Sequence, residues 1–449
     1  MQMIHLPELF IQRMHDQLGV EAPDFFTALD QPPPVSIRLH HSKGRCPFPL
    51  NMPVPWSKLG YYLEDRPSFH LDPHWHGGAY YVQEATSMIL DAMLSTLVTD
   101  KQPRIWVDLC AAPGGKSGIL ASHLGPGDIL LANEVVSGRR SVLRENLTKA
   151  GYMNTFISGY PSHVFDAPFA DIMLIDAPCA GEGMMRKDPE AIRQWSPSLV
   201  QSCCGMQRQI VSEAIRALKE GGLLIYSTCS YSEEENLSNI LHFTNTLPLQ
   251  SIAVNFPEDW GLTTLEKQSV SGYQLFPHKV RGEGLFIAVL QKTAVESDNR
   301  GKSKKIISPF ASADQMIGSI FKSSNHFQFR KNNVVFQFVT AEAEPKASEL
   351  LMHLPAAEAI AEAGECKGKD VIPSHFVAMS DIPITHEGIL DLDLDTALDY
   401  LQRSTNLSPA LEAPGWYLIR YHQTILGWAK RTQQGWKNHY PMAWRLRNR

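Results

Sequence analysis

The fold is decided by the stretch Ile105-Trp106-Val107-Asp108-Leu109-Cys110-Ala111-Ala112-Pro113-Gly114-Gly115-Lys116. Its first five residues form an apolar run with the length of a buried strand, and the pattern from Lys116 to Leu124 predicts a helix. The small residues between them let the backbone approach a ligand closely, and the start of the helix offers N–H groups to a carboxylate or phosphate. The loop is neither GxGxxG nor GxxxxGK[ST], which disfavours a dinucleotide or a nucleoside triphosphate.

Beyond this loop, short apolar runs alternate with helical patterns. The predicted strands are Ile129–Ala132, Ile172–Ile175 and Leu223–Tyr226. The predicted helices are Ser137–Ala150 and Met206–Leu218, the second ending at Gly221-Gly222. Runs of this kind are typical of buried parallel strands, so the sequence predicts an α/β protein with a doubly wound, Rossmann-like sheet.

At 449 residues the chain exceeds what one hydrophobic core supports, so we expect several domains. The first, residues 1–95, opens with a helical pattern, contains a short strand at Val35–Leu39 and continues as loops to about Gly78. The sheet domain spans 96–292, and a polar linker follows at 293–308. A small α/β module at 309–369 and a domain at 370–449 with strands near 416–421 and 424–429 complete the chain.

Charge is unevenly distributed along the chain. The net charge is −6, yet residues 415–449 contain no acidic residue. That tail carries Arg420, Lys430, Arg431, Lys437, Arg445, Arg447 and Arg449. A second basic cluster consists of Lys292, Arg300, Lys302, Lys304 and Lys305. Local basic surface captures phosphates whatever the net charge, so both clusters are candidate nucleic-acid contacts, with a solvated linker and tail as the alternative.

The seven cysteines are odd in number and form no CxxC pair, which disfavours a disulfide scaffold and a metal site. We expect reduced thiols in a cytoplasmic protein. No apolar run has the roughly 20 residues that a membrane helix needs, and the start of the chain reads as an amphipathic helix instead of a secretion signal.

Four polar side chains lie at or just after the ends of predicted strands. Asp176 and Cys179 follow one strand, Cys229 follows the next, and Glu134 ends the strand after the loop. Ligands of open α/β sheets bind at the carboxyl ends of the strands, so these side chains converge on one crevice beside the loop. An acid in the position of Glu134 is placed to accept hydrogen bonds from ribose hydroxyls.

Two thiols and a carboxyl group in one crevice suit methylation of carbon 5 of cytosine. A thiolate that adds to carbon 6 makes carbon 5 nucleophilic, and Asp176 can favour that addition at the third ring nitrogen. The base must leave its stack, which favours loops or unfolded substrate. The alternative is that a cysteine at a strand end is buried core, and we expect this of Cys46, Cys110, Cys203, Cys204 and Cys366.

The motifs Asp108–Lys116, Asp176–Cys179 and Ser227–Ser230 resemble those of the Nop/Sun family of RNA cytosine-5 methyltransferases. Tyr80–Ala85 and Phe276–Phe286 look like flanking segments of the same family. Length and a tail containing Gly427-Trp428 and residues 437–441 resemble the bacterial branch that modifies small-subunit ribosomal RNA. The resemblance implies a methyltransferase domain that uses S-adenosyl-L-methionine, and a PUA-like RNA-binding module over residues 370–449.

The resemblance also implies roles for single residues. Cys229 would be the nucleophile and Cys179 would assist breakdown of the covalent adduct, although in DNA cytosine-5 enzymes the Pro-Cys cysteine attacks, so the two roles could be exchanged. Cofactor binding or orientation of the base would fall to Cys110, Ala111, Ala112, Pro113, Gly114, Gly115, Lys116, Glu134 and Asp176. Ala180 departs from the usual serine, and Gly159–Ser162 lacks the acid that many members place near the adenine.

Other functions stay open at this point. The chain could methylate DNA, protein, a small molecule or transfer RNA, or it could be a non-catalytic ribosome-assembly factor that binds RNA. The expected partner is RNA, with no membrane and no obligate protein partner. The aromatic residues Trp428, Trp436, Tyr440 and Trp444 could stack on nucleotides or build the core of the last domain.

Overall fold

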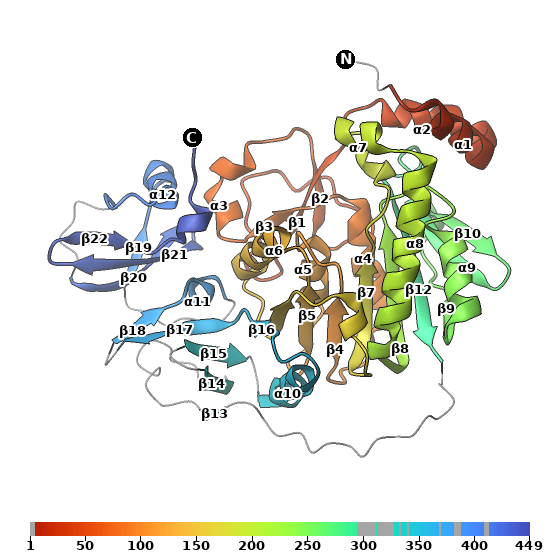
Figure 1. Cartoon of the computed structure of the whole chain (residues 1–449). Coiled ribbons are helices and arrows are strands. Elements are labelled where there is room, and N and C mark those ends of the chain that lie inside the picture. The colour runs from red at the N-terminus through yellow and green to blue at the C-terminus, as the bar shows by residue number, and fades with distance from the viewer. Residues whose placement is uncertain are drawn as a thin grey trace.

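The computed structural model describes residues 5–293, 311–312, 327–331, 334–338, 341–367, 370–380, 388–407 and 413–449. The chain begins with α1 (Glu8–Leu18) and α2 (Ala22–Leu29), which lie at one end of the molecule beside α7 (Pro189–Gln194) (Figure 1). Phe10 and Phe25 of these helices pack against Trp195 in a shared apolar cluster. A three-stranded sheet follows, in the order β2 (Gly60–Leu63), β1 (Val35–Leu39), β3 (Tyr80–Val82).

The central sheet has a parallel core flanked by antiparallel strands. Its parallel strands lie in the order β8 (Leu218–Thr228), β7 (Ala170–Asp176), β4 (Ile105–Asp108), β5 (Ile129–Asn133), β6 (Thr155–Ser158). Beyond β8 the sheet continues antiparallel through β12 (Leu285–Lys292), β11 (Val270–Leu275) and β10 (Thr263–Lys267). The strand order reverses between β4 and β7, which is where doubly wound folds bind ligands. The predicted fold class is confirmed.

Two short strands extend this sheet. β9 (Leu249–Ile252) pairs with β12, and β16 (Glu358–Ala359) pairs with β6. Because β16 lies within the predicted module 309–369, part of that segment packs on the central sheet. The predicted domain boundaries themselves remain a proposal.

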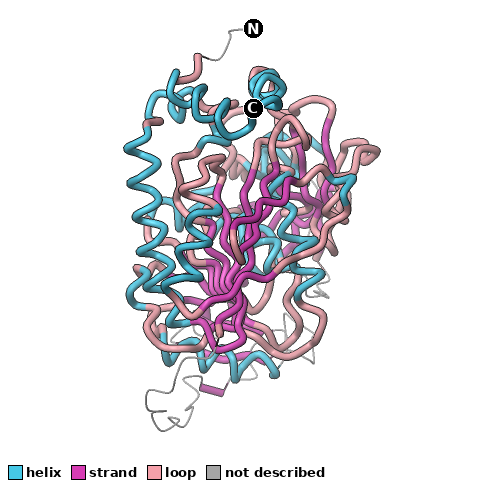
Figure 2. The backbone as a smooth tube through the Cα atoms, turned by 90° about the vertical axis from the view of Figure 1, so that its right-hand side faces the viewer, coloured by secondary structure: helices cyan, strands magenta, loops and turns pink. Residues whose placement is uncertain are grey.

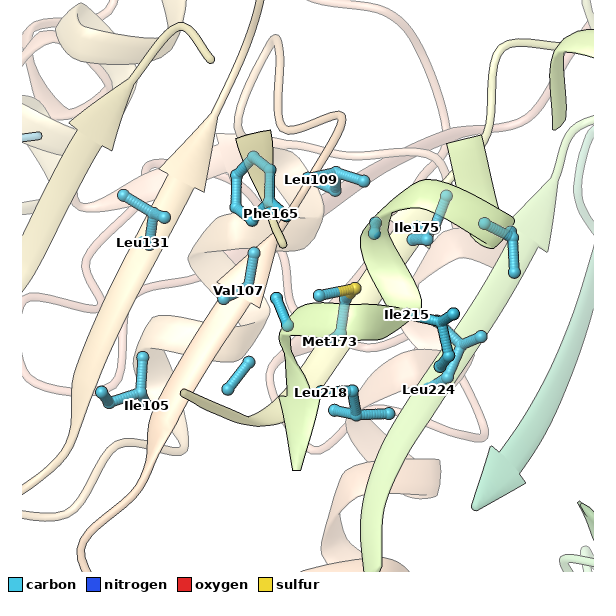
Figure 3. Close-up of a cluster of buried hydrophobic side chains, with 14 of the residues drawn as sticks. Ile105, Val107, Leu109, Leu131, Phe165, Met173, Ile175, Ile215, Leu218 and Leu224 are labelled. Atoms are coloured by element: carbon cyan, nitrogen blue, oxygen red, sulfur yellow. The ribbon is translucent and has the colours of Figure 1, made fainter. Parts of the chain in front are cut away.

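Helices cover both faces of the sheet because successive residues of a strand point to opposite sides. Trp106 of β4 packs with α4 (Ile89–Leu97) and α5 (Gly115–Ser122). Ile105 and Val107 point to the other face, toward the labelled apolar cluster (Figure 3). Residues of α8 (Pro197–Ala214), α9 (Leu237–Thr246) and α10 (Glu344–His353) belong to the same cluster. The strands run through the middle of the molecule between these helices (Figure 2). α6 (Ser137–Ala150) has the bounds predicted from the sequence.

One predicted helix is wrong in its bounds. α8 begins at Pro197, nine residues before the predicted start, because Ser196 caps it by accepting a hydrogen bond from the N–H of Leu199 at 3.1 Å. A 3-10 turn closes the helix, and Gly221-Gly222 lies inside β8. The predicted loop region before Gly78 also contains β2 and the short helix α3 (Pro73–His76).

The C-terminal part contains two small sheets. The first has the strand order β13 (Ala311–Ser312), β14 (Phe327–Lys331), β15 (Val334–Phe338), β17 (Glu362–Lys367), β18 (Asp370–Pro373). The short helix α11 (His375–Met379) follows it. The second sheet has the order β19 (Ile389–Asp391), β20 (Gly415–Tyr421), β21 (Thr424–Thr432), β22 (Gly435–Asn438) and packs on α12 (Leu394–Leu401).

The tail aromatics are mostly core. Trp428, Trp436 and Tyr440 are buried, so they are not presented for stacking on nucleotides, and Trp444 is half-buried.

The prediction that Lys292 belongs to a basic surface cluster is wrong. Its side chain is buried, and its Nζ donates hydrogen bonds to the carbonyls of Ile215 and Leu218. The other members of that basic cluster, Arg300, Lys302, Lys304 and Lys305, lie outside the described residues. No helix in the described ranges combines the length and apolarity needed to cross a membrane.

Candidate active site

The loop between β4 and α5 is tied to the strands on either side of it. The amide of Asn133 donates to the carbonyl of Leu109 at 3.1 Å, and the N–H of Ala111 donates to the carbonyl of Asn133 at 2.9 Å. Gly114 adopts a φ of +114°, a conformation that side chains disfavour. A Cβ on Gly115 would lie 3.1 Å from the ring of Tyr81. The loop therefore needs its glycines to make this turn against β3.

Glu134 follows the carboxyl end of β5 and is 3% exposed. Its Oε1 accepts a hydrogen bond from the N–H of Val136 at 2.9 Å, and its Oε2 lies 3.5 Å from Nη2 of Arg139. The same arginine donates to the carbonyl of Ala112 at 2.9 Å. The acid and the loop are thus held together at the tips of β4 and β5.

Asp176 ends β7 and faces the start of α5. Its Oδ1 accepts a hydrogen bond from Oγ of Ser227 at 2.7 Å, and its Oδ2 lies 2.9 Å from Nζ of Lys116. Burial disfavours the charge of Lys116, but the ion pair outweighs burial and raises the pKa of its ammonium. A fixed positive charge therefore lies beside Asp176 at the point where the strand order reverses.

Cys179 and Cys229 lie at the tips of β7 and β8 with 3.3 Å between their sulfur atoms. Both are half-buried and neither forms a disulfide. The hydrogen bond to Cys229, together with burial, raises the pKa of Cys179 well above its ordinary value. The thiol of Cys179 can therefore donate its proton toward Cys229.

The other cysteines lack such a setting. Cys203 and Cys204 are buried on α8, and burial raises the pKa of both thiols. Burial also raises the pKa of Cys46 and of Cys110, both half-buried. The side chain of Cys366 lies outside the described residues.

The sequence reading gave no role to two buried acids beside the cysteines. Glu182 follows Cys179 by three residues, and Glu235 follows Cys229 by six. Both are buried, at 1% and 0% exposure, and both make hydrogen bonds to the turns that carry the cysteines. A glutamate between two glycines, six residues after the end of β7, was the signal that could have pointed to Glu182.

Three sequence-family profiles match the chain. Residues 95–291 match the profile described as 16S rRNA methyltransferase RsmB/F, residues 6–85 the N-terminal domain of 16S rRNA methyltransferase RsmF, and residues 387–446 the methyltransferase RsmF PUA domain. The chain belongs to the RsmB/F family of methyltransferases. The predicted resemblance is confirmed at this level, including the PUA domain at the end of the chain.

Relatives named ribosomal RNA small subunit methyltransferase F include one from Klebsiella pneumoniae and one from Vibrio vulnificus. The first is 32% identical over 65% of this chain, and this chain spans 64% of its length. The second is 28% identical over 98% of this chain and 97% of its own length.

Solved structures share the fold. A methyltransferase homologue from Pyrococcus horikoshii is 27% identical, with a TM-score of 0.55 over 64% of this chain and 96% of that one. NSun6 from the same organism, solved with SFG, has the same fold at 18% identity, with a TM-score of 0.54 over 66% of this chain and all of that one. SFG is an analogue of S-adenosylmethionine, the methyl donor of SAM-dependent methyltransferases.

The residues present suit this cofactor. The first N–H groups of α5 have no partner within the helix and can bind a carboxylate, and Glu134 supplies buried carboxylate oxygens for hydroxyl groups. The half-buried thiols of Cys179 and Cys229 lie at the tips of the next two strands, on the same edge of the sheet.

Proposed function

We propose that this chain methylates carbon 5 of a cytosine in the RNA of the small ribosomal subunit, with Cys229 as the nucleophile. The observation that carries the proposal is the 3.3 Å separation of the two sulfur atoms at the tips of β7 and β8, beside the ion pair of Asp176 and Lys116. A scaffold that only binds RNA needs neither thiol. The ribosomal substrate is suggested by the names of the relatives from Klebsiella pneumoniae and Vibrio vulnificus.

In the proposed reaction the thiolate of Cys229 forms a bond to carbon 6 of the ring, and the electrons of the 5,6 double bond make carbon 5 nucleophilic. Asp176 and Lys116 hold a proton near the third ring nitrogen and balance the charge that the ring gains. Residues 110–116, Glu134 and Asp176 would hold S-adenosylmethionine, which would supply the methyl group to carbon 5 and leave as S-adenosylhomocysteine. A water molecule then takes the proton from carbon 5, and the electrons of that C–H bond restore the 5,6 double bond. The bond between carbon 6 and the sulfur of Cys229 breaks, and its electron pair returns to the sulfur.

Cys179 is assigned to the last step. Its thiol keeps its proton and lies within hydrogen-bonding distance of Cys229. It can therefore donate to the sulfur of Cys229 as the carbon–sulfur bond breaks. The resemblance to RNA cytosine-5 methyltransferases favours this assignment over the exchanged one.

The experiment is transfer of a labelled methyl group to RNA by the wild type, by Cys229→Ala and by Cys203→Ala as a matched control. Cys203 is a buried cysteine of α8 that has no place in the proposed reaction. We expect Cys229→Ala to lose at least about 10³-fold in rate and Cys203→Ala to lose little, because loss of a nucleophile removes the covalent route. Activity that survives unchanged in Cys229→Ala overturns the nucleophile assignment.

The substrate class needs its own measurement. Bisulfite sequencing of total RNA from cells with and without the gene locates the 5-methylcytosine that depends on this chain. We expect the site in small-subunit ribosomal RNA. A lost site in transfer RNA instead would overturn the ribosomal assignment and leave the chemistry intact.

A further inference from the structure

Glu182 and Glu235 lie in the interior directly behind the cysteine pair. Their exposures are 1% and 0%, so both carboxyl groups are removed from water. Within the described part of the chain, neither carboxyl has a lysine or arginine partner within ion-pair distance. Burial of two charges without a cation is costly, and such groups keep a proton or gather hydrogen-bond donors.

Most oxygen atoms of these two carboxyl groups accept hydrogen bonds from obligate donors. Glu182 accepts from the indole N–H of Trp195 at 2.8 Å and from the backbone N–H of Tyr231 at 2.7 Å. Oε1 of Glu235 accepts from the backbone N–H of Ala180 at 3.0 Å and from the side-chain amide of Gln207 at 2.8 Å. Oε2 of Glu235 has a different kind of partner.

That partner is the hydroxyl of Ser230. Its Oγ lies 2.6 Å from Oε2 of Glu235 and 3.0 Å from Oε2 of Glu182. A serine hydroxyl has one hydrogen and can donate it to only one of these oxygens. If both carboxyl groups were ionised, one of the two contacts would join bare oxygen atoms, so the three groups need one additional proton.

The hydrogen-bond donors around each carboxylate oxygen also indicate which oxygen carries that proton. Glu182 accepts two N–H donors that cannot accept in return, and it also accepts from Oγ of Ser232 at 2.6 Å. Oε1 of Glu235 is occupied by N–H donors, which leaves Oε2 as its protonated atom. The chain of donation then runs from Glu235 to Ser230 and from Ser230 to the charged Glu182.

We infer that Glu235, as a neutral carboxylic acid, is a positioning residue that locks together the turns carrying Cys179 and Cys229. Its two oxygens bind the residue directly after each cysteine, Ala180 and Ser230. Glu182 also takes part in this connection between the two turns. The N–H of the next residue, Gly183, donates to the carbonyl of Cys229 at 2.8 Å. This inference rests on the proposed function for its catalytic consequence, but not for the protonation state.

Loss of this proton would place a second buried negative charge behind the nucleophile. The titratable groups that face Glu235 are Glu182 and the thiols and phenol of Cys179, Cys203, Cys204 and Tyr226, and none of them is a cation. Burial raises the pKa of Glu235 to about 7. We therefore expect the hydrogen bonds that connect the two turns to weaken as the pH rises above this value.

The first test reads the proton directly and needs no RNA. Infrared difference spectra at pH 6.5 are recorded for the full chain against Glu235→Gln, and against Glu234→Gln as control. Glu234 is the adjacent residue, partly exposed and paired with Arg13 at 2.5 Å. We expect Glu235→Gln to remove the carbonyl band of a protonated carboxylic acid, and Glu234→Gln to remove only bands of an ionised carboxylate. If Glu235→Gln removes no acid band, the inference is overturned, whatever the substrate of the enzyme.

The second test follows single-turnover methyl transfer between pH 6.5 and pH 9. With a pKa of about 7, roughly one wild-type molecule in a hundred keeps the proton at pH 9. We expect the ratio of the wild-type rate to the Glu235→Gln rate to fall roughly 80-fold over this range, because an amide cannot ionise. The ratio of wild type to Glu234→Gln should stay constant, as should the KM for RNA in both variants.

A ratio of wild type to Glu235→Gln that does not change with pH would overturn the positioning role. Thermal unfolding of both variants checks that they fold, and the conservative amide keeps a donor toward Ser230. If the proposed function is wrong, Cys229→Ala stays active in methyl transfer. The infrared result at Glu235 does not depend on that function, so the two failures can be told apart.

Discussion

Lys116 and Asp176 form an ion pair across the gap where the strand order reverses, with 2.9 Å between Nζ and Oδ2. The lysine opens α5 after β4 and the aspartate ends β7, so two motifs 60 residues apart in the sequence meet at one point. The side chain of Asp176 is 34% exposed, which leaves it accessible to a substrate. The pair thus combines a fixed charge with a carboxyl group that is open to a ligand.

The first prediction concerns Asp176→Asn, with Asp171→Asn as control. Asp171 lies near the other end of β7 and pairs with Lys219, so it has the same strand and the same kind of partner away from the site. We expect Asp176→Asn to lower the single-turnover rate by about 10²- to 10⁴-fold, the range for loss of an acid–base group. Asp171→Asn should keep the wild-type rate. Equal effects of the two variants would show that Asp176 acts on folding alone.

The second prediction concerns release of the product. Because the thiol of Cys179 lies 3.3 Å from the sulfur of Cys229, Cys179→Ala should slow the breaking of the carbon–sulfur bond. We expect this variant to accumulate a protein–RNA species that survives a denaturing gel. The double variant with Cys229→Ala should form none. Absence of the species in Cys179→Ala contradicts the release role, and its appearance in the double variant contradicts the nucleophile.

The alternation of strands and helices made the central sheet predictable, because buried parallel strands leave apolar runs that any reader of the sequence can find. The approach of Cys179 to Cys229 was predictable for the same reason, since the carboxyl ends of parallel strands share one edge. The link between Glu235 and Ala180 was not, because it depends on how two irregular turns fold toward each other. The burial of Trp428 was also open, since short amphipathic strands look alike whichever face is covered.

The third prediction concerns RNA binding by the tail. Arg420 pairs with Asp391 at 2.6 Å and Arg449 pairs with Asp399 at 2.8 Å. Their positive charges are partly neutralised by these acids, so we expect them to contribute less to phosphate binding. Lys437, Arg445 and Arg447 are exposed. We expect replacement of these three by glutamine to weaken RNA binding and to lower the slope of log K against log salt.

Each phosphate contact contributes about 0.7 to 0.9 to that slope. Titrations by fluorescence anisotropy at several salt concentrations give its value, and Arg420→Gln is the matched control that should change it little. A slope unchanged in the triple variant would show that RNA binds elsewhere on the chain.

The fourth prediction concerns acid stability. Burial, and then the charge of Lys149, lowers the pKa of His76 from 6.5 to about 3; burial, and then Lys43, lowers that of His40 to about 2. Between these values and 6.5 the unfolded chain binds more protons than the folded one, so stability falls as the pH falls through this window. From pH 6.5 to pH 5 each histidine should cost about 2 kcal/mol in the free energy of unfolding.

Urea denaturation at pH 7 and pH 5 measures this loss. His76→Asn should flatten the pH dependence, whereas replacement of the exposed His163 by glutamine should leave it as in the wild type. A wild-type stability that does not change between the two pH values would contradict the neutral state of these histidines.

The last prediction concerns how the C-terminal part docks on the methyltransferase. Gly151 ends α6 with a φ of +76°, and a Cβ there would lie 2.0 Å from the carbonyl oxygen of Met379 in α11. Gly138, near the start of the same helix, has no neighbouring atom within 4 Å of an added Cβ. Gly151→Ala should lower the free energy of unfolding by about 1–2 kcal/mol because alanine disfavours the left-handed conformation. The added Cβ must also displace α11. Gly138→Ala should leave stability unchanged or raise it by up to about 1 kcal/mol. Thermal unfolding of the two variants separates the effects, and equal melting temperatures would mean that α11 does not pack against the end of α6.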